Sequence, residues 1–415
     1  MNARSVRLLA SAVSALAVSA PGLVLAQEPA PNVPVTDRAR PEFDPLGIRA
    51  GGFLIFPSIT VSEVYDDNVF ADPDDEEDDF ITLLQPRVRV ASNFPRHGLG
   101  LTVGSDVAFF ASESDENYQD FFLTGDGRLD ITRESALSAS TTIGRFHQGR
   151  DDPEDVGADE ISTFFRYGGE VSFEQLFNRL NYRLTGRVDR VEFEESFDED
   201  LDRTEYDALA RVGFFVSPRF NTFVEGRYNV EDRDVEPGDL VNGAPVLFDR
   251  DAHGWEARLG TEVDITAVLF GEAFVGYRQQ YYDEDAFEDD DGISFGADLT
   301  WNPTLLTTLA LSGGADFVPT AVGDASANFR SLVALDVDHE LLRNLLIGGG
   351  VSYIRDDFDR IDRVDDTFNI GANITYILNR NLAVEGAYLF TDRSSDLDAE
   401  EFTRNRITLS LTARL

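Results

Sequence analysis

The chain has 415 residues, of which 42% are apolar and 27% charged, with a formal net charge of -42 and no cysteine. Its mean hydropathy of -0.22 is too polar for a bundle of membrane helices, and its aromatic content of 11% is too high for a disordered acidic chain. The charge excludes nucleic acid as a partner, because phosphates would be repelled. The lack of cysteine excludes disulfides and thiolate chemistry.

The chain begins with the features of an export signal. Arg4 and Arg7 precede an apolar run, 8–26, that ends in small residues. A positive start, an apolar centre and a small-residue cleavage site together indicate a secretory signal peptide. A membrane anchor is the alternative, but Pro21 interrupts the run, which is barely long enough to span a bilayer. We therefore expect residues 1–26 to be removed on export.

The next segment and the rest of the chain differ in pattern. Residues 27–50 contain five prolines among small and charged residues, which favours an extended periplasmic segment without a core of its own. From residue 51 to 415 the apolar residues recur with a period of two. In 367–376, for example, Phe368, Ile370 and Ile374 alternate with small or polar residues. Such alternation predicts strands with one apolar and one polar face.

The connections between these strands alternate in length. Long acidic stretches occur at 66–79, 112–119, 149–160, 194–203, 232–251, 283–291, 319–327, 355–366 and 392–401. Short turns lie between them, at 93–96, 133–135, 177–179, 217–219, around 266, and at 302–304, 342–344 and 378–380. A chain that crosses a bilayer in hairpins leaves short turns in the periplasm and long loops outside. The sheet must close, because an open edge in lipid leaves backbone groups unpaired.

These observations predict an all-β protein in the outer membrane, a closed antiparallel transmembrane β-barrel of about 18 strands at 51–415, with 16 strands as the alternative. Aromatic residues support the register, because they fall near strand ends as two interfacial girdles require. On the phase assigned to lipid, Tyr228, Trp255 and Phe402 lie near long loops, and Trp301 and Tyr376 near turns.

Charged residues recur on the phase assigned to the lumen. Arginines occupy it on the sixth to eleventh strands and carboxylates on the twelfth to seventeenth. The predicted pore-lining residues are Arg166, Arg183, Arg187, Arg211, Arg227, Arg258, Arg278, Asp298, Asp316, Asp336, Asp338 and Glu385. An arginine costs little in a water-filled lumen, but about 2–4 kcal/mol at the midplane of the lipid face. The pattern favours a pore in which an arginine wall faces a carboxylate wall; a lumen plugged by ion pairs is the alternative.

One long loop differs from the others. The loop at 232–251 contains an apolar stretch, 240–248, which should be covered rather than left in water. We expect it to fold into the barrel mouth and narrow the channel, as loops of wide barrels commonly do. The alternative is a hairpin on the rim that turns at Asn242-Gly243.

The sequence offers little for catalysis or metal binding. His97, His147, His253 and His339 lie on separate hairpins, and neither a Ser-His-Asp arrangement nor an HExxH motif is present. A lipid hydrolase would need Ser331 beside His253 or His339. The acidic runs 74–79 and 283–291 lack the calcium-loop spacing. We predict no catalytic residue, cofactor or metal site, although such carboxylates suit divalent cations that bridge to lipopolysaccharide.

Two runs of residues resemble a known family. Residues 45–57, followed by Tyr65-Asp66-Asp67-Asn68-Val69-Phe70, resemble the start of the putative β-barrel porin family of Gram-negative outer membranes. Tyr388, Arg393-Ser394-Ser395 and Asn405 are similar to its last hairpin. Members of that family are often associated with exopolysaccharide gene sets.

The resemblance implies a porin or channel-like barrel for polar solutes, linked to surface polysaccharide export and without known catalysis. Its partners would be outer-membrane lipid, lipopolysaccharide and the barrel assembly machinery. Outer-membrane barrels usually end in an aromatic residue that this machinery reads, whereas this chain ends in Leu415. The alternative function is a structural or adhesive barrel whose acidic loops bind partners or divalent cations.

Overall fold

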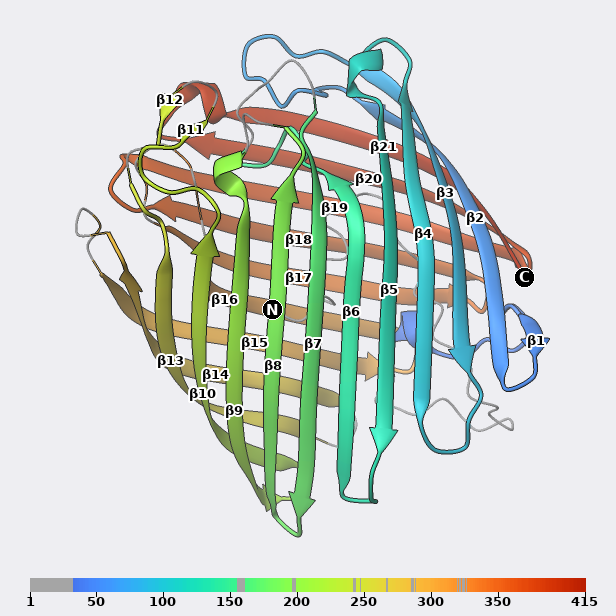
Figure 1. The fold of residues 1–415 in the computed structure, drawn as a ribbon. Coiled ribbons are helices and arrows are strands. Elements are labelled where there is room, and N and C mark those ends of the chain that lie inside the picture. The colour runs from blue at the N-terminus through green and yellow to red at the C-terminus, as the bar shows by residue number, and fades with distance from the viewer. Residues whose placement is uncertain are drawn as a thin grey trace.

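The structure is a computed structural model that describes residues 33–154, 161–195, 199–241, 244–246, 248–265, 268–284, 287, 289–318, 320, 322, 325 and 327–415. The predicted signal peptide, 1–26, lies outside them. Within the described residues, no helix has the length and apolar character needed to cross a membrane. Most of the described residues form strands, as Figure 1 shows.

Eighteen strands form the wall of a barrel. They are β2 (Phe53–Asp66), β3 (Asp79–Ser92), β4 (Gly98–Phe110), β5 (Tyr118–Asp130), β6 (Ser135–His147), β7 (Thr163–Phe177), β8 (Leu180–Phe193), β9 (Arg203–Ser217), β10 (Phe220–Arg233), β13 (Ala252–Ile265), β14 (Leu269–Tyr282), β15 (Asp290–Thr304), β16 (Thr307–Val318), β17 (Asn328–Leu342), β18 (Leu345–Phe358), β19 (Arg363–Asn379), β20 (Leu382–Ser395) and β21 (Phe402–Arg414).

Seven smaller elements are not counted among these eighteen strands. They are the strands β1 (Ile48–Ala50), β11 (Leu240–Val241) and β12 (Ala244–Pro245), and the 3-10 turns η1 (Val35–Asp37), η2 (Ser114–Glu116), η3 (Glu199–Leu201) and η4 (Asp398–Glu400).

The barrel closes between its first and last strands. β2 pairs antiparallel with β21 from Ser58 opposite Arg414 to Asp66 opposite Arg406. Towards the turn end, where β21 has ended, β1 pairs antiparallel with residues 53–55 of β2. Every other barrel strand pairs antiparallel with the strands before and after it in the sequence. The predicted closed antiparallel barrel of 18 strands is confirmed.

The connections are sorted by length, as expected. Short turns join the strands at one end, here called the turn end, and longer connections join them at the other, the loop end. The connection predicted at 355–366 is shorter, because β18 and β19 extend to leave only 359–362 between them. Charge pairing explains this extension. Asp366 accepts hydrogen bonds from Tyr353 (2.6 Å) and Arg355 (3.1 Å) across the two strands, so these polar residues continue the ladder.

The outer face is apolar, and its register corrects one assignment. Leu99, Val103 and Phe109 on β4 are exposed on this face, as the alternation predicts. Phe402 is not: it is only 4% exposed, and the Arg393 guanidinium lies 4.8 Å from its ring centre inside the barrel. Assigning Phe402 to the lipid face was wrong, so the even-numbered residues of β21 face the lumen.

The loop at 232–251 adopts the alternative that we favoured less. Its apolar stretch forms the short β11–β12 hairpin, with Leu240 opposite Pro245 and the Leu240 side chain exposed. Figure 1 shows this hairpin at the loop end. The Asn242-Gly243 turn lies outside the described residues. The segment that enters the lumen instead is 148–153, where the Asp151 carbonyl oxygen accepts a hydrogen bond from Arg393 on β20 (2.6 Å).

The segment before the barrel also packs inside it. Val35 is fully buried, and its N–H donates to the Thr308 hydroxyl on the inner face of β16 (2.8 Å). Arg40 pairs with Glu340 on β17 (3.1 Å), and both side chains are buried. Arg414 donates to the Phe43 carbonyl oxygen. Residues 33–44 therefore line the turn end of the lumen, where their buried side chains pack against the inner face of the barrel.

The orientation of the barrel can be tested by labelling, because the native chain has no cysteine. We expect a membrane-impermeant maleimide to label Asp75→Cys and Asp396→Cys in intact cells, since both residues belong to the loop end. Arg179→Cys, in a turn, should react only after the cells are opened. Labelling of Arg179→Cys in intact cells would reverse the predicted orientation.

Candidate functional site

The alternation of each strand sends charged residues into the lumen. On β8, Leu184 and Val188 are exposed on the outer face, whereas Arg183 and Arg187 lie on the inner face opposite Glu174 and Glu170 of β7. The period of two that predicts the strand therefore also selects which side chains meet inside the barrel.

The inner face of β7 and β8 carries exposed ion pairs. Three arginines each bind a carboxylate on the neighbouring strand: Arg166 with Asp189 (2.9 Å), Arg183 with Glu174 (2.7 Å) and Arg187 with Glu170 (2.7 Å). The side chains of these arginines are 51%, 43% and 45% exposed, respectively. Such exposure inside a closed barrel means that this side of the lumen has room for water.

The ion pairs around Arg211 on β9 are buried, in contrast to those on β7 and β8. Its guanidinium binds Glu225 on β10 (2.7 Å), Glu262 on β13 (3.2 Å) and Glu272 on β14 (2.6 Å). It also lies 3.7 Å from the ring centre of Phe223, and only 9% of its side chain is exposed. One arginine thus links four strands and excludes water from this side of the lumen.

Arg258 extends this packed side along β13. It binds Glu256 (2.6 Å) and Glu225 (3.3 Å) and lies 4.5 Å from the ring centre of Phe274. Because Glu225 binds both Arg211 and Arg258, the two arginines belong to one connected network. Glu225 and Glu256 are buried but paired, as burial of a charge requires, whereas Glu262 and Glu272 are about a third exposed.

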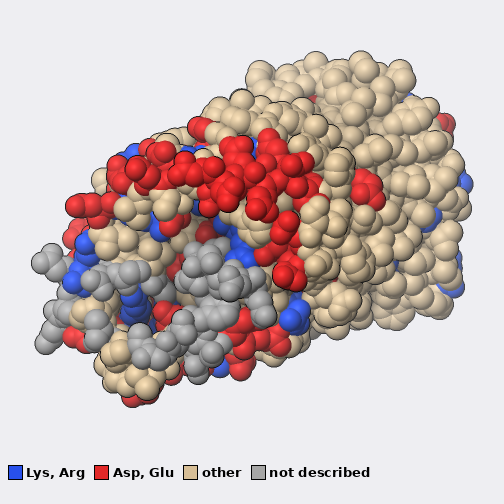
Figure 2. Space-filling view, turned by 90° about the horizontal axis from the view of Figure 1, so that it is seen from above, with Lys and Arg blue, Asp and Glu red and all other residues tan. Residues whose placement is uncertain are grey.

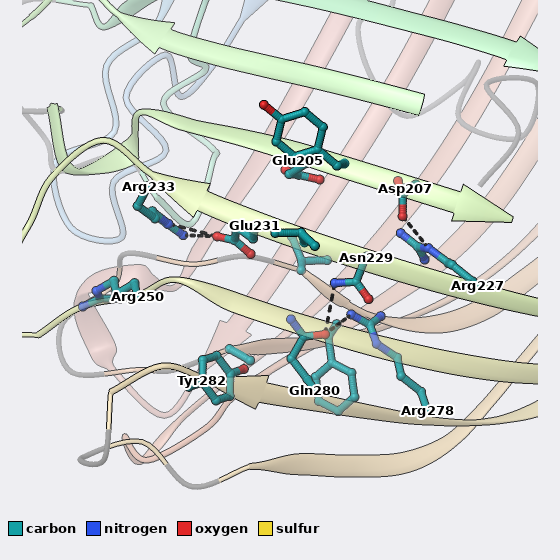
Figure 3. A pocket seen from close by; sticks show the side chains of 15 residues that line it. Glu205, Asp207, Arg227, Asn229, Glu231, Arg233, Arg250, Arg278, Gln280 and Tyr282 are labelled. Atoms are coloured by element: carbon teal, nitrogen blue, oxygen red, sulfur yellow. Dashed lines mark hydrogen bonds and ion pairs between the residues drawn. The ribbon is translucent and has the colours of Figure 1, made fainter. Parts of the chain in front are cut away.

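A further group of ion pairs on this side of the lumen reaches β16. Arg227 binds Asp207 (2.7 Å) and Asp316 (3.3 Å), and Arg278 also pairs with Asp316. Figure 3 shows Arg227 directed at Asp207, and Arg278 beside Gln280. The cavity left between these side chains has a volume of about 50 Å³, so ion pairs fill the space here.

The predicted carboxylate wall does not stand apart from the arginines. Asp316 is bound by Arg227 and Arg278, as described above. Glu385 accepts a hydrogen bond from Thr375 (2.8 Å), and Asp298 is exposed on the inner face of β15. Asp336 and Asp338 lie on the inner face of β17, towards the turn end. All twelve predicted pore-lining residues occupy lumen-facing strand positions, but they do not form two opposed walls.

A cluster of arginines on β20 and β21 was missed from the sequence. Arg393, Arg404 and Arg406 lie on the inner face near the loop end, and Arg404 binds both carboxylate oxygens of Asp66 (2.6 and 2.9 Å). The signal was the spacing of two between Arg404 and Arg406. It was hidden because placing Phe402 on the lipid face turned both arginines outward.

The two histidines named for a lipid hydrolase have other contacts in the structure. The His253 Nδ1 lies 3.6 Å from Asp283, and its ring stacks on Tyr281. The His339 Nδ1 shares a hydrogen bond with the Thr307 hydroxyl (3.0 Å). Neither contact involves Ser331, on which the hydrolase alternative depended. No group of three acidic or histidine side chains suited to a metal ion occurs in the described part of the chain.

Comparisons with solved structures concern the fold. The barrel is similar to OccK2 (OpdF) of Pseudomonas aeruginosa, with 12% identity over 87% of this chain and 98% of that chain and a TM-score of 0.48. It is also similar to OpdL of the same organism, with 14% identity over 88% of this chain and 100% of that chain and a TM-score of 0.45. No curated protein matches the chain.

A comparison with family models gives the assignment. The model described as Putative beta-barrel porin 2 matches residues 40–415, which include the whole barrel and part of the segment that lines its turn end. The chain therefore belongs to this porin family, and it is a porin of the outer membrane.

Proposed function

We propose that small polar solutes cross the barrel along the water-exposed side lined by β5 to β8. The observation that carries this proposal is the exposure of the inward ion pairs on β7 and β8, described above. On β5, Arg128 continues the series, with an exposed guanidinium 3.0 Å from Asp130. Groups of both signs line this path, so it suits solutes that replace water by hydrogen bonds and charge contacts.

The packed network around Arg211 has a different role in this proposal. It occupies the other side of the lumen and confines the aqueous path to part of the cross-section. In this proposal one side of the lumen is a polar path, and ion pairs fill the other. The β-barrel is wide enough for this division, because barrels of 16–18 strands leave an aqueous channel.

We also propose that the chain consists of a signal peptide at 1–26, a lead-in at 27–50 and a barrel at 51–415, and that the turn end lies in the periplasm. The link to surface polysaccharide export rests on the family resemblance. Lipopolysaccharide, the assembly machinery and divalent cations at the acidic loops are likewise proposed partners. Figure 2 shows acidic side chains gathered at the loop end, where such cations would be attracted.

Ion selectivity tests the proposed path. Replacing Arg183 and Arg187 by glutamine removes two positive charges from the lumen and leaves Glu174 with only its longer contact to Arg128 (3.8 Å). The permeability ratio of cations to anions should therefore rise. The matched pair Glu170→Gln and Glu174→Gln should lower it. Reversal potentials in planar bilayers under a salt gradient measure both effects. Unchanged reversal potentials in both double variants would refute the path along β7 and β8.

The Arg211 network should matter for stability. Arg211→Met removes the cation that Glu225, Glu262 and Glu272 share. Breaking a buried ion pair costs about 3–5 kcal/mol, and we expect the lower end, because Glu225 keeps Arg258 and the other two carboxylates are partly exposed. Arg187→Met removes an exposed pair, which is worth only about 0–1 kcal/mol. Urea unfolding in detergent, followed by tryptophan fluorescence, gives the difference. Equal losses in the two variants would contradict the structural role of the network.

The segment at 33–44 should narrow the turn end. Its deletion removes the buried side chains of Val35 and Arg40 from the lumen, so single-channel conductance should increase. Arg40→Gln weakens the contact with Glu340 but keeps the segment, and a smaller increase is expected. A folded deletion variant with the conductance of the native protein would show that the segment does not limit the flow of ions.

A further inference from the structure

A second cavity lies near the loop end, away from the exposed path along β7 and β8. It has a volume of about 490 Å³ and lies between the inward segment 148–153 and the inner faces of β2, β3, β5 and β17 to β21. This volume is within the range of cavities that bind small molecules, roughly 300–1,000 Å³. It is about ten times the space left within the ion pairs of Figure 3.

The inward segment is held by two charge contacts. Arg150 binds both carboxylate oxygens of Glu116 in η2 (2.6 and 3.0 Å), and both side chains are buried. Arg393 donates to the Asp151 carbonyl oxygen (2.6 Å). These contacts place the Asp151 carboxylate 3.6 Å from the Arg404 guanidinium. Segment 148–153 thus places the Asp151 carboxylate beside a cluster of arginines on β20 and β21, Arg393, Arg404 and Arg406.

The three arginines of that cluster differ in their partners. Arg404 is held by Asp66, and Arg393 donates to Asp151 and to the Thr367 hydroxyl (3.3 Å). Among the described residues, the Arg406 side chain has no hydrogen bond or ion pair, and its Nε is buried without a partner. Arg406 lines the cavity. Its guanidinium can therefore donate hydrogen bonds and offer a positive charge to a ligand in the cavity.

The electrostatics of Asp151 agree with an anion position. Burial alone would raise the pKa of its carboxyl group, but Arg404, Arg406 and Arg393 outweigh burial and hold that pKa below its ordinary value. The carboxylate is thus ionised at neutral pH. The arginines stabilise a negative charge at this point, and a solute carboxylate would gain the same stabilisation.

Five other residues among those that line the cavity indicate the kind of anion. Asn369, Thr367 and Thr391 provide amide and hydroxyl groups, and Tyr118 and Phe402 provide aromatic faces. Hydroxyl groups of a solute can pair with the first set, while the apolar side of a sugar ring can pack on the second. An inorganic anion would use the arginines alone and leave most of this lining without contacts.

We infer that the cavity beneath segment 148–153 is a binding subsite of the channel for a small hydroxylated carboxylate, of the class of an acidic monosaccharide. The solute carboxylate binds Arg406 and the arginines beside it, in competition with the carboxylate of Asp151. This inference rests on the proposed function, because it names a solute class for the same lumen. It adds a site on β20 and β21 that lies apart from the proposed path.

The competition makes two variants respond in opposite directions. Arg406→Gln removes the unpaired cation, so the affinity for galacturonate should fall about tenfold or more, as expected for the loss of a hydrogen bond to a charged group. Asp151→Asn removes the competing charge and keeps the size of the side chain, so affinity should rise. Arg133→Gln, in a turn at the far end of the barrel, loses the same charge and should leave affinity unchanged.

Isothermal titration of the purified full-length barrel in detergent measures these affinities, with galactose as the neutral sugar. We expect galacturonate to bind and galactose to bind at least about tenfold more weakly, because it lacks the carboxylate. Equal binding of the two sugars would overturn the inference. So would equal galacturonate affinity in the native protein, Arg406→Gln and Asp151→Asn.

Conductance of the same preparations separates this inference from the proposed function. If the native protein conducts ions but Arg406→Gln binds galacturonate as the native protein does, the channel stands and the subsite is refuted. If none of the preparations conducts ions while galacturonate binding still depends on Arg406, the subsite stands and the channel is refuted.

Discussion

The pairing of β2 with β21 is the contact on which the rest of the structure depends. In lipid, each unpaired backbone N–H or C=O group costs several kcal/mol, so the first and last strands must meet. They do so although the chain between them is long: the Ser62 and Ser410 hydroxyls at this seam, 348 positions apart, lie 2.8 Å from one another. Once the barrel is closed, successive side chains of each strand point alternately to the lipid and to the lumen. Every inward charge then shares one enclosed space.

That enclosure explains why the basic residues of the lumen are so strongly paired. All 35 basic residues of the chain are arginines, and a planar guanidinium can bind carboxylates from several directions. Arg211 uses this capacity to bind carboxylates on three other strands. The compact ammonium group of lysine would not span the same contacts. Arginine therefore acts inside the barrel as a cross-link between strands, and the space that it does not fill is left to water.

The sequence predicted what depends on period and on connection length, and it missed what depends on contacts across the barrel. The strand count follows from the connections, closure follows from the need to pair backbone groups in lipid, and the inward position of the arginines from Arg166 to Arg278 follows from local alternation. Phe402 shows the limit of that method. It stands at a strand end, where polar neighbours on both faces leave the phase ambiguous, and a shift of one residue turns a whole strand over. Arg40 binds Glu340, 300 positions away, and Asp151 binds Arg393, 242 positions away. A local sequence pattern cannot predict contacts between residues so far apart in the chain.

The net charge of the chain and the charge of its lumen need not act in the same direction. The carboxylates of Asp74–Asp78 are exposed at the loop end, where salt screens their field beyond about 8 Å at physiological ionic strength. The charges inside the barrel are partly buried and are screened much less. A solute anion is thus repelled weakly in the water above the loops and attracted strongly once it is near Arg406. In the proposed channel, selectivity is consequently set by the charges inside the barrel, and the overall charge of -42 does not by itself make the channel selective for cations.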